Sequence, residues 1–390
     1  KGRRSRMQKK LRKSTLATVF LSAVGLGLVP AASLAITKAP EAPSSDIKVE
    51  TVASGLAEPW GLQFLPDDRM LVTERPGRLR IVSMDGKKSK PVSGLPKVHA
   101  QGQGGLLDVR LAPDFDTTGT LYFSFAEPRG GGKAATAVGR GQLVLDGDKA
   151  ALDNVEIIYR QNPAVRTGRH FGSRIVIDKS GDLFVTTGDL GTESAKAQDP
   201  IVSIGKVSLI HTDGKPASGN PHLPGWAPEV WSIGHRNIQG AVLDPSTGQL
   251  WTVEHGAQGG DELNNPQKGS NYGWPVISYG RHYSGAKIGK GTSKSGMEQP
   301  VYYWDPSIAT SGLELYTGDL IPGWKGNFLV GGLAGAQLSR LVMEDGKVAR
   351  EEALLTGRGD RIRDVREGPD GAVYVLTDDD DGKILRLSPK

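Results

Sequence analysis

The feature that most constrains the fold of this chain is a short pattern that returns six times. Each copy is a turn rich in Asp and Gly, followed by a hydrophobic strand with alternating side chains. Glycine suits such turns because it adopts positive φ without strain, and the β-branched and aromatic residues that follow favour strands. The six copies cover residues 66–73, 116–122, 178–185, 244–251, 323–330 and 369–375.

Six similar turn–strand units predict an all-β fold, specifically a six-bladed β-propeller over residues 48–390. The spacing between copies is irregular, so long loops are expected between some strands. A β-sandwich is the alternative, although six such units are more than it needs. We expect the last strand, residues 383–387, to pair with the first, residues 48–52, because this closes the ring and removes two exposed edges.

The amino end has the pattern of an export signal. Basic residues from Lys1 to Lys13 precede an apolar run over 16–29, and Ser33-Leu34-Ala35 places small residues at a cleavage site. The apolar run is shorter than the ~20 residues that span a bilayer. We therefore predict a signal peptide over 1–35, a linker over 36–47, periplasmic or secreted location, and no stable membrane insertion after cleavage. A permanent membrane anchor is the alternative.

The basic net charge of the chain comes from this segment. Eight of the 48 Lys and Arg residues fall within 1–35, so the remainder has 40 basic and 43 acidic residues. Such a balance argues against a nucleic-acid partner. The chain has no cysteine, so disulfides do not stabilise it.

Two of the predicted loops carry candidate catalytic or binding side chains. Gln103 lies in a Gly-rich stretch, residues 102–108, where its amide could bind a planar ligand. His170 precedes a strand, and its ordinary pKa near neutrality suits a general base. A purely structural role stays open for both residues on their chemistry alone.

Two further clusters suggest ions. Residues 234–237 and 254–262 combine carboxylates with glycyl carbonyls, which are oxygen ligands that Ca²⁺ accepts, although the spacing is not that of an EF-hand and a solvated loop is the alternative. Arg361 and Arg363 are two apart on a predicted strand and so share a face. They require an anion between them, either a charged ligand or an internal Asp.

Together these clusters resemble the soluble quinoprotein sugar dehydrogenases, and most closely the periplasmic aldose sugar dehydrogenases that use pyrroloquinoline quinone (PQQ). The resemblance rests on five stretches in family order, which span nearly the whole predicted propeller. They are GQGGLLDVRLAPDF at 102–115, HFGSRIVIDKSGDLFVTTGD at 170–189, IGHRNIQG at 233–240, EHGAQGGDELNNPQKGSNYGWP at 254–275 and RIRDVREGPDGAVYVLTD at 361–378.

The resemblance implies an enzyme that oxidises aldose sugars at C1 and passes electrons to an external acceptor. By this resemblance, His170 is the general base and Arg236 lies near the reactive carbonyls of PQQ. The other implied cofactor contacts are Gln103, Asn237, Arg361, Arg363, Trp304, Pro306 and Ser307. The implied Ca²⁺ ligands are the carbonyls of Gly256 and Ala257, with a second site at the Glu262 carboxylate and the Tyr272 carbonyl.

Two positions bear on cofactor affinity and sugar selectivity. Ala334 stands where relatives carry a cofactor-binding Lys, which predicts weaker PQQ binding unless a nearby base such as Arg340 or Lys325 replaces it. Asp108 matches the aldose branch where the glucose-selective branch has Gly, which argues against narrow glucose specificity.

Two other functions remain as alternatives. A Ca²⁺-dependent lactonase on a similar propeller would need several carboxylates converging on the axis, whereas the sequence offers basic and amide groups. A non-catalytic binding propeller is supported only by Ala334. The physiological sugar, the natural acceptor and the oligomeric state are not predicted.

Overall fold

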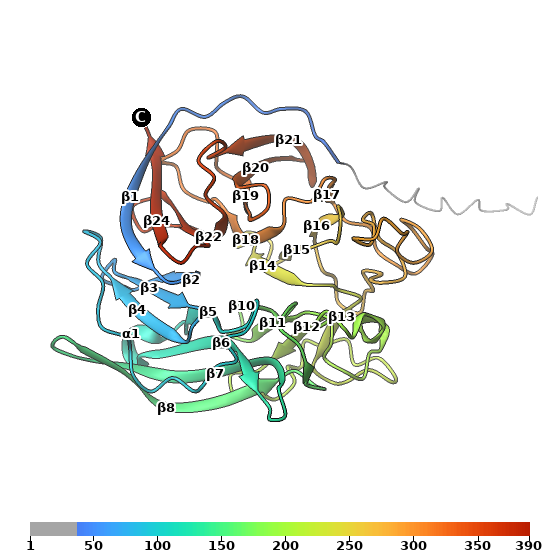
Figure 1. Ribbon diagram of the computed structural model, residues 1–390, viewed down its shortest axis with the longest axis horizontal. Coiled ribbons are helices and arrows are strands. Elements are labelled where there is room, and N and C mark those ends of the chain that lie inside the picture. Colours follow the sequence, from blue (N-terminus) through green and yellow to red (C-terminus); the bar gives the residue numbers. More distant parts are fainter. Residues whose placement is uncertain (1–36) are drawn as a thin grey trace, which may run out of the picture. The chain divides into compact units, whose positions relative to one another are not determined.

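The computed structural model describes residues 37–390, and the predicted signal peptide at 1–35 lies outside the described residues. Six antiparallel sheets follow one another around a ring, viewed along its axis in Figure 1. The prediction of an all-β, six-bladed propeller is confirmed. Within residues 37–390 no helix is long and apolar enough to cross a membrane.

The sheets are the blades, numbered here in chain order. The strands of the first three blades are β2 (Pro59–Phe64), β3 (Met70–Glu74) and β4 (Arg78–Val82); β5 (Leu106–Leu111), β6 (Thr120–Pro128), β7 (Lys133–Asp146) and β8 (Lys149–Arg160); and β10 (Gly172–Ile177), β11 (Leu183–Thr187), β12 (Lys206–Ile210) and β13 (Val230–Ile233). A short β9 (Val165–Arg166) pairs with β7, and the helical turns are α1 (Phe115–Thr118) and η1 (Ser194–Gln198).

The last three blades complete the ring. Their strands are β14 (Ile238–Leu243), β15 (Leu250–Glu254), β16 (Asp261–Asn264) and β17 (Tyr302–Trp304); β18 (Thr310–Leu315), β19 (Phe328–Gly332), β20 (Gln337–Glu344) and β21 (Lys347–Leu354); and β22 (Ile362–Glu367), β23 (Val373–Thr377), β24 (Gly382–Pro389) and β1 (Ile47–Leu56).

The six sequence repeats occupy equivalent places in this architecture. Each repeat is the turn before the second strand of a blade together with that strand, namely β3, β6, β11, β15, β19 and β23. These strands are buried along their length because each is covered by neighbouring blades on both faces. This burial explains why the second strands are hydrophobic enough for the repeat to be identified in the sequence.

Blade 1 differs from the other five blades, since its sheet has three strands. The chain after β4 takes the outer position irregularly: the amides of Ser89 and Val92 bond to the carbonyls of Ile81 and Leu79. Pro91 lies between them and has no N–H to donate, which prevents a regular fourth strand.

The ring closes as expected, by pairing of the first and last strands. β1 is antiparallel to β24, with Val49 opposite Leu387 and Thr51 opposite Leu385. This pairing completes blade 6 from both ends of the propeller sequence.

A second closure lies just before β1. In the predicted linker, the Ala39 amide donates to the Tyr302 hydroxyl of blade 4, and the Ala42 amide donates to the Glu351 carbonyl of blade 5. Ser45 bonds through its amide and hydroxyl to the Glu352 carboxylate. Residues 39–46, called the arm below, therefore connect blades 4 and 5 to the closing strand.

The first strand of each blade lies innermost, so β2, β5, β10, β14, β18 and β22 surround the axis. The third residues of these strands are Gly61, Asp108, Arg174, Gly240, Gly312 and Asp364. Arg174 is fully buried and forms ion pairs of 3.0 Å with both Asp108 and Asp364. A side chain at Gly312 would come within 2.7 Å of the Asp364 Cα. The glycines thus leave space for the Arg174 side chain, which fills the centre of the ring.

Candidate active site

The predicted site residues gather at one end of the ring axis because of their positions along the strands. Gln103, His170, Arg236, Asn237 and Arg361 all lie within three residues before an innermost strand begins. The residues that follow second strands reach the same end, since first and second strands are antiparallel. Three of these are Asp189, His255 and Asp378.

His170 is held tightly at the centre of this group. Its Nδ1 lies 2.6 Å from Oδ1 of Asp189, and the other oxygen of Asp189 accepts a 2.9 Å hydrogen bond from the Trp274 indole. The backbone of His170 has φ 59°, a left-handed conformation that costs energy outside glycine and is often retained at functional sites.

The electrostatics of His170 suit a general base. Burial is the main cause that lowers its pKa, while the bond to Asp189 raises it and Arg236 lowers it further. The Asp189 carboxylate, whose own pKa is lowered mainly by its bond to His170 against the effect of burial, can only accept. Nδ1 therefore carries the proton, and Nε2 is left as a proton acceptor.

Gln103 and Asn237 fix the backbone on both sides of His170. The Gln103 side-chain oxygen accepts from the His170 amide at 2.8 Å, and the Asn237 oxygen accepts from the Gly172 amide at 3.0 Å. The Asn237 side-chain nitrogen is buried without a protein partner. Both residues belong to the site, and Asn237 has a donor available for a ligand.

Arg236 lies beside the same group. Its amide donates to Glu254 at 2.6 Å, its guanidinium donates to the His255 carbonyl at 3.1 Å, and it stacks 5.2 Å from the centre of the Trp274 ring. Its Nε is buried without a partner. The side chain is thus held in place with one donor unused.

Arg361 and Arg363 do lie side by side, and an internal carboxylate lies between them. One oxygen of Asp378 is 3.2 Å from Arg361 and 3.1 Å from Arg363. The two arginines and Arg75 lower the pKa of Asp378 against the effect of burial. An internal Asp therefore supplies one anion between the two arginines. Two cations still face this single carboxylate.

Gln239 connects this pair to the rest of the site. Its side-chain oxygen accepts from Arg363 at 2.6 Å and lies 3.1 Å from Nε2 of His255. Burial and the surrounding arginines hold the pKa of His255 well below its usual value. The site therefore concentrates positive charge.

Ala334 lies close to Arg361, whose guanidinium reaches the Leu333 carbonyl at 3.4 Å. Arg340 and Lys325, which were considered as replacements for a lysine at position 334, are both paired with carboxylates. Arg340 is buried in blade 5 against Glu352, at 2.7 Å, and Lys325 pairs with Asp319 at 2.8 Å.

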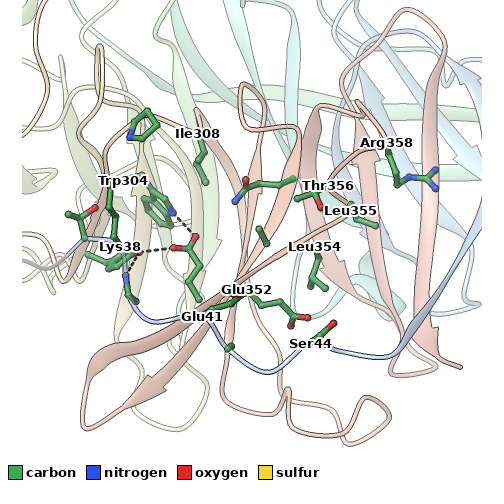
Figure 2. Close-up of a pocket in the computed structure, with 18 of the residues that line it drawn as sticks. Lys38, Glu41, Ser44, Trp304, Ile308, Glu352, Leu354, Leu355, Thr356 and Arg358 are labelled. Carbon is green, nitrogen blue, oxygen red and sulfur yellow. Dashed lines mark hydrogen bonds between the residues drawn. The ribbon is translucent and has the colours of Figure 1, made fainter.

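The segment 304–307, predicted to form part of a cofactor wall, points its side chains to two different places. The Trp304 indole donates to Glu351 at 2.8 Å across the outer seam between blades 4 and 5. There it lines a cavity of about 750 Å³ with Pro306 and the arm (Figure 2). Ser307 points elsewhere and donates to Asp261 at 2.8 Å. Trp304 lies on the outer strand of blade 4, so its side chain contacts blade 5 at the seam.

Asp108 is wholly buried on the axis, where it binds Arg174 and the Ile175 amide. It cannot contact a sugar in this position. Its physical role is to hold the axial arginine, so the expectation of broad sugar specificity continues to rest on the resemblance to the aldose branch.

The first predicted metal segment is a tight loop. The Gly256 amide donates to Asp261 at 2.8 Å, the same carboxylate that Ser307 binds, and Ala257 forms a bridge with Gly259. These bonds use the amide of Gly256 and leave its carbonyl for another ligand. Ser307 is thereby linked to the Gly256–Ala257 segment through Asp261.

The second predicted metal position holds two buried carboxylates. Glu262 lies opposite Glu254 on adjacent strands, and Asn264 donates to both, at 3.1 and 3.2 Å. Burial and the Glu254 charge raise the pKa of Glu262 to about 8. Tyr272 packs nearby, stacked 4.9 Å from His235, which bonds to Glu254. Among residues 37–390 no group of three or more His, Cys, Asp or Glu side chains is arranged to hold a metal.

Several contacts here were not predicted. Asp189, Trp274 and Asp378 lie within the quoted sequence stretches, but only the fold shows that Asp189 and Asp378 follow second strands directly. Gln239 and His255 were also inside those stretches. His255 directly follows a second strand, which was a signal that could have found it, whereas Gln239 lies inside β14 and needed the three-dimensional register.

The glucose/sorbosone dehydrogenase family pattern matches residues 56–386, most of the chain. The chain belongs to the glucose/sorbosone dehydrogenase family. It is 43% identical to aldose sugar dehydrogenase YliI of Escherichia coli K12, over 88% of this chain and 93% of that protein. It is 26% identical to quinoprotein glucose dehydrogenase B of Acinetobacter calcoaceticus, over 88% and 89%.

Solved structures of this family have the same fold. The soluble aldose sugar dehydrogenase of Escherichia coli in its apo form matches with a TM-score of 0.84 at 43% identity, over 88% of this chain and 100% of that one. The PQQ-bound aldose sugar dehydrogenase of Streptomyces coelicolor matches with a TM-score of 0.73 at 30% identity, over 89% and 99%. These relatives are therefore sugar dehydrogenases.

Proposed function

We propose that this protein oxidises aldose sugars at C1 to lactones, with PQQ and Ca²⁺ as cofactors and an external electron acceptor. The observation that carries the proposal is His170, held by Asp189 with a free Nε2, beside a cluster of arginines with unused donors. A base next to an anion-binding surface is what sugar oxidation by an anionic quinone requires.

The residues present fit PQQ. Nε of Arg236, Nδ2 of Asn237 and Nε of Arg363 are buried donors without protein partners, and an anionic ligand would satisfy them. Arg361 and Arg363 outnumber the one carboxylate between them. When bound, PQQ supplies a two-electron acceptor for the hydride from C1.

The protein's part in the reaction begins with His170. Nε2 accepts the proton of the C1 hydroxyl, while Asp189 holds Nδ1–H and stabilises the imidazolium that forms. The amides of Gln103 and Asn237 keep the His170 loop in its left-handed conformation. Arg236 presents a cation held in place by Trp274 and the His255 carbonyl.

For calcium we propose two positions. The carbonyls of Gly256 and Ala257 and the buried Glu262 carboxylate are hard oxygen donors. A cation beside Glu254 and Glu262 would relieve the repulsion that raises the pKa of Glu262. Trp304 and Ser307 stay secondary proposals, because Trp304 bonds to Glu351 and Ser307 bonds to Asp261.

The test is dye-linked oxidation of aldoses by purified apoprotein, with PQQ and Ca²⁺ added separately and together. We expect turnover only when both are present, and loss of turnover after chelation that Ca²⁺ restores. Turnover by metal-free holoenzyme, confirmed by elemental analysis, would contradict the calcium assignment. PQQ-independent lactone hydrolysis would favour a lactonase instead.

The carboxylates on the axis favour the dehydrogenase over the lactonase. Asp108 and Asp364 both pair with Arg174, so neither is free for a metal cage. The third function, a non-catalytic binding propeller, would be favoured by an apoprotein that neither binds PQQ nor oxidises sugars.

We also propose export through a signal peptide at 1–35, which makes the periplasm or the exterior the site of action. The support is the basic, apolar and small-residue order of the sequence. Sequencing the amino end of the protein from an exported fraction tests it. A start near Ile36 is expected, and an uncleaved amino end in the membrane fraction would contradict it.

A further inference from the structure

We propose that a basic stripe on blade 2, leading to His170, is the docking surface for an acidic electron-accepting protein. The stripe consists of Arg129, Lys133, Arg160, Arg166 and Arg169. The inference rests on the proposed function, because sugar oxidation leaves two electrons that must leave the protein before the next turnover.

The charge balance of the stripe is opposite to that of the chain around it. Residues 36–390 have slightly more acidic than basic residues. In the stripe, five cations meet one acid, Glu127, which pairs with Arg129 and with Arg160 at 3.1 Å. The local excess of positive charge attracts and orients an anionic partner.

The geometry brings like charges together. Lys133 on β7 and Arg166 on β9 are directly opposite in an antiparallel pair, an arrangement that is destabilising without an anion nearby. Both side chains are exposed. Arg166 bonds to the Gly131 carbonyl at 2.9 Å, and within residues 37–390 neither Lys133 nor Arg166 forms an ion pair.

The stripe is continuous with the site. β9 ends at Arg166, the Gly168 carbonyl accepts from the Gln103 amide at 2.7 Å, and the exposed Arg169 immediately precedes His170. An acidic protein bound to the stripe would therefore lie against the edge of the candidate active site. Arg129 and Lys133 flank the three glycines that form the turn between β6 and β7, two strands that Figure 1 labels.

The electron balance requires two one-electron steps. Each aldose oxidised releases two electrons and two protons, so two molecules of a ferric haem protein are reduced per turnover. Native cytochrome c, which is basic, and the same protein after succinylation of its lysines, which is acidic, form a matched pair of probes.

The experiment measures reduction of each cytochrome by the reconstituted holoenzyme with saturating aldose at low and high salt. We expect kcat/KM for the succinylated form to exceed that for the native form by about tenfold or more at low salt, with the difference lost as salt rises. The double variant Lys133→Glu, Arg166→Glu should reverse the preference while leaving single-turnover sugar oxidation unchanged.

The matched control is Lys149→Glu, Lys347→Glu, with the same charge change at exposed positions where β8 and β21 begin. It should keep the preference of the native protein. Equal effects of the two double variants, or no preference between the cytochromes, would contradict the proposal that the stripe is a docking surface. Absence of sugar oxidation in the single-turnover arm would instead contradict the proposed function. If the double variant melts early, Lys133→Gln gives a smaller shift in the same direction.

Discussion

At the scale of single residues, His170 combines a left-handed backbone, a buried carboxylate partner and a lowered pKa. The backbone of the flanking residues is fixed by two side-chain amides, Gln103 and Asn237. Such constraint is costly for a residue that only packs, and it is expected for one that must receive a proton in a fixed direction.

The pH dependence of the reaction should follow this pKa. A base must be unprotonated, and the pKa of His170 is lowered from 6.5, so the acidic limb of kcat/KM should lie below pH 6.5. His170→Ala should lose about 10²- to 10⁴-fold in kcat and retain PQQ binding. An acidic limb above pH 7, or unchanged turnover in His170→Ala, would contradict the assignment.

Asp189→Asn gives a second test of the same pair. Asp189 raises the pKa of His170, so its removal should move the acidic limb to lower pH, and loss of orientation should lower kcat. A pH profile and PQQ titration of the variant separate these effects. A limb that moves to higher pH would show that Asp189 does not act on His170 in this way.

Arg361 and Arg363 should differ when each is replaced by Ala. Arg361 is 49% exposed, so its loss should weaken PQQ binding and leave stability nearly unchanged. Arg363 is 7% exposed and shares Asp378, so its loss should also destabilise the apoprotein. Removing either arginine does not simply relieve repulsion, because Asp378 lies between the two.

Titration with PQQ and thermal melts of both variants check this. A charged hydrogen bond is worth about 1.5–3 kcal/mol, which corresponds to about 10- to 150-fold in affinity. Wild-type PQQ affinity in both variants would make the pair purely structural. Ala334→Lys, beside Arg361, should raise affinity in the same assay.

At the scale of elements, the sequence repeats identified the second strands because those strands are buried on both faces. The same reasoning could not find the irregular edge of blade 1, where Pro91 removes a donor, or the outward direction of Trp304. Outer strands are partly exposed, so their pattern is weak. The site residues were found because they lie in short Gly-rich stretches at strand ends, whereas Asp378 and Gln239 needed the three-dimensional register.

The arm gives a prediction at this scale. Deleting residues 36–46 removes the bonds to Tyr302, Glu351 and Glu352 but keeps β1. We expect a melting temperature lower by a few degrees, since a loss of about 1 kcal/mol moves a domain of 150–250 residues by about 2–4 °C. A chain beginning at residue 37 is the control. Identical melting of the two would show that the arm adds no stability.

At the scale of the whole molecule, one buried arginine links the innermost strands. Arg174 also lies 4.2 Å from the Trp60 ring centre and donates to the Gln239 carbonyl at 2.6 Å, directly beneath the site. The sequence alone did not reveal this, because Asp108, Arg174 and Asp364 are distant in the chain and meet only when the ring closes.

Arg174→Met should therefore be destabilising, by about 1–3 kcal/mol, because it removes the 3.0 Å partner of two buried carboxylates. Asp108 keeps Arg110 at 3.6 Å and Asp364 keeps Arg366 at 3.3 Å, so both retain a counter-ion. Denaturant unfolding of the native protein and the variant measures the loss. Equal stability of the two would show that the axial arginine adds nothing to the fold.

The most direct test of the whole account is an anaerobic single turnover. Apoprotein is loaded with PQQ and Ca²⁺, mixed with excess aldose in the absence of an acceptor, and the lactone is quantified against bound PQQ. The account predicts one lactone per bound PQQ, and none from His170→Ala loaded to the same level. Bound PQQ with no lactone, or no PQQ binding at all, would contradict it.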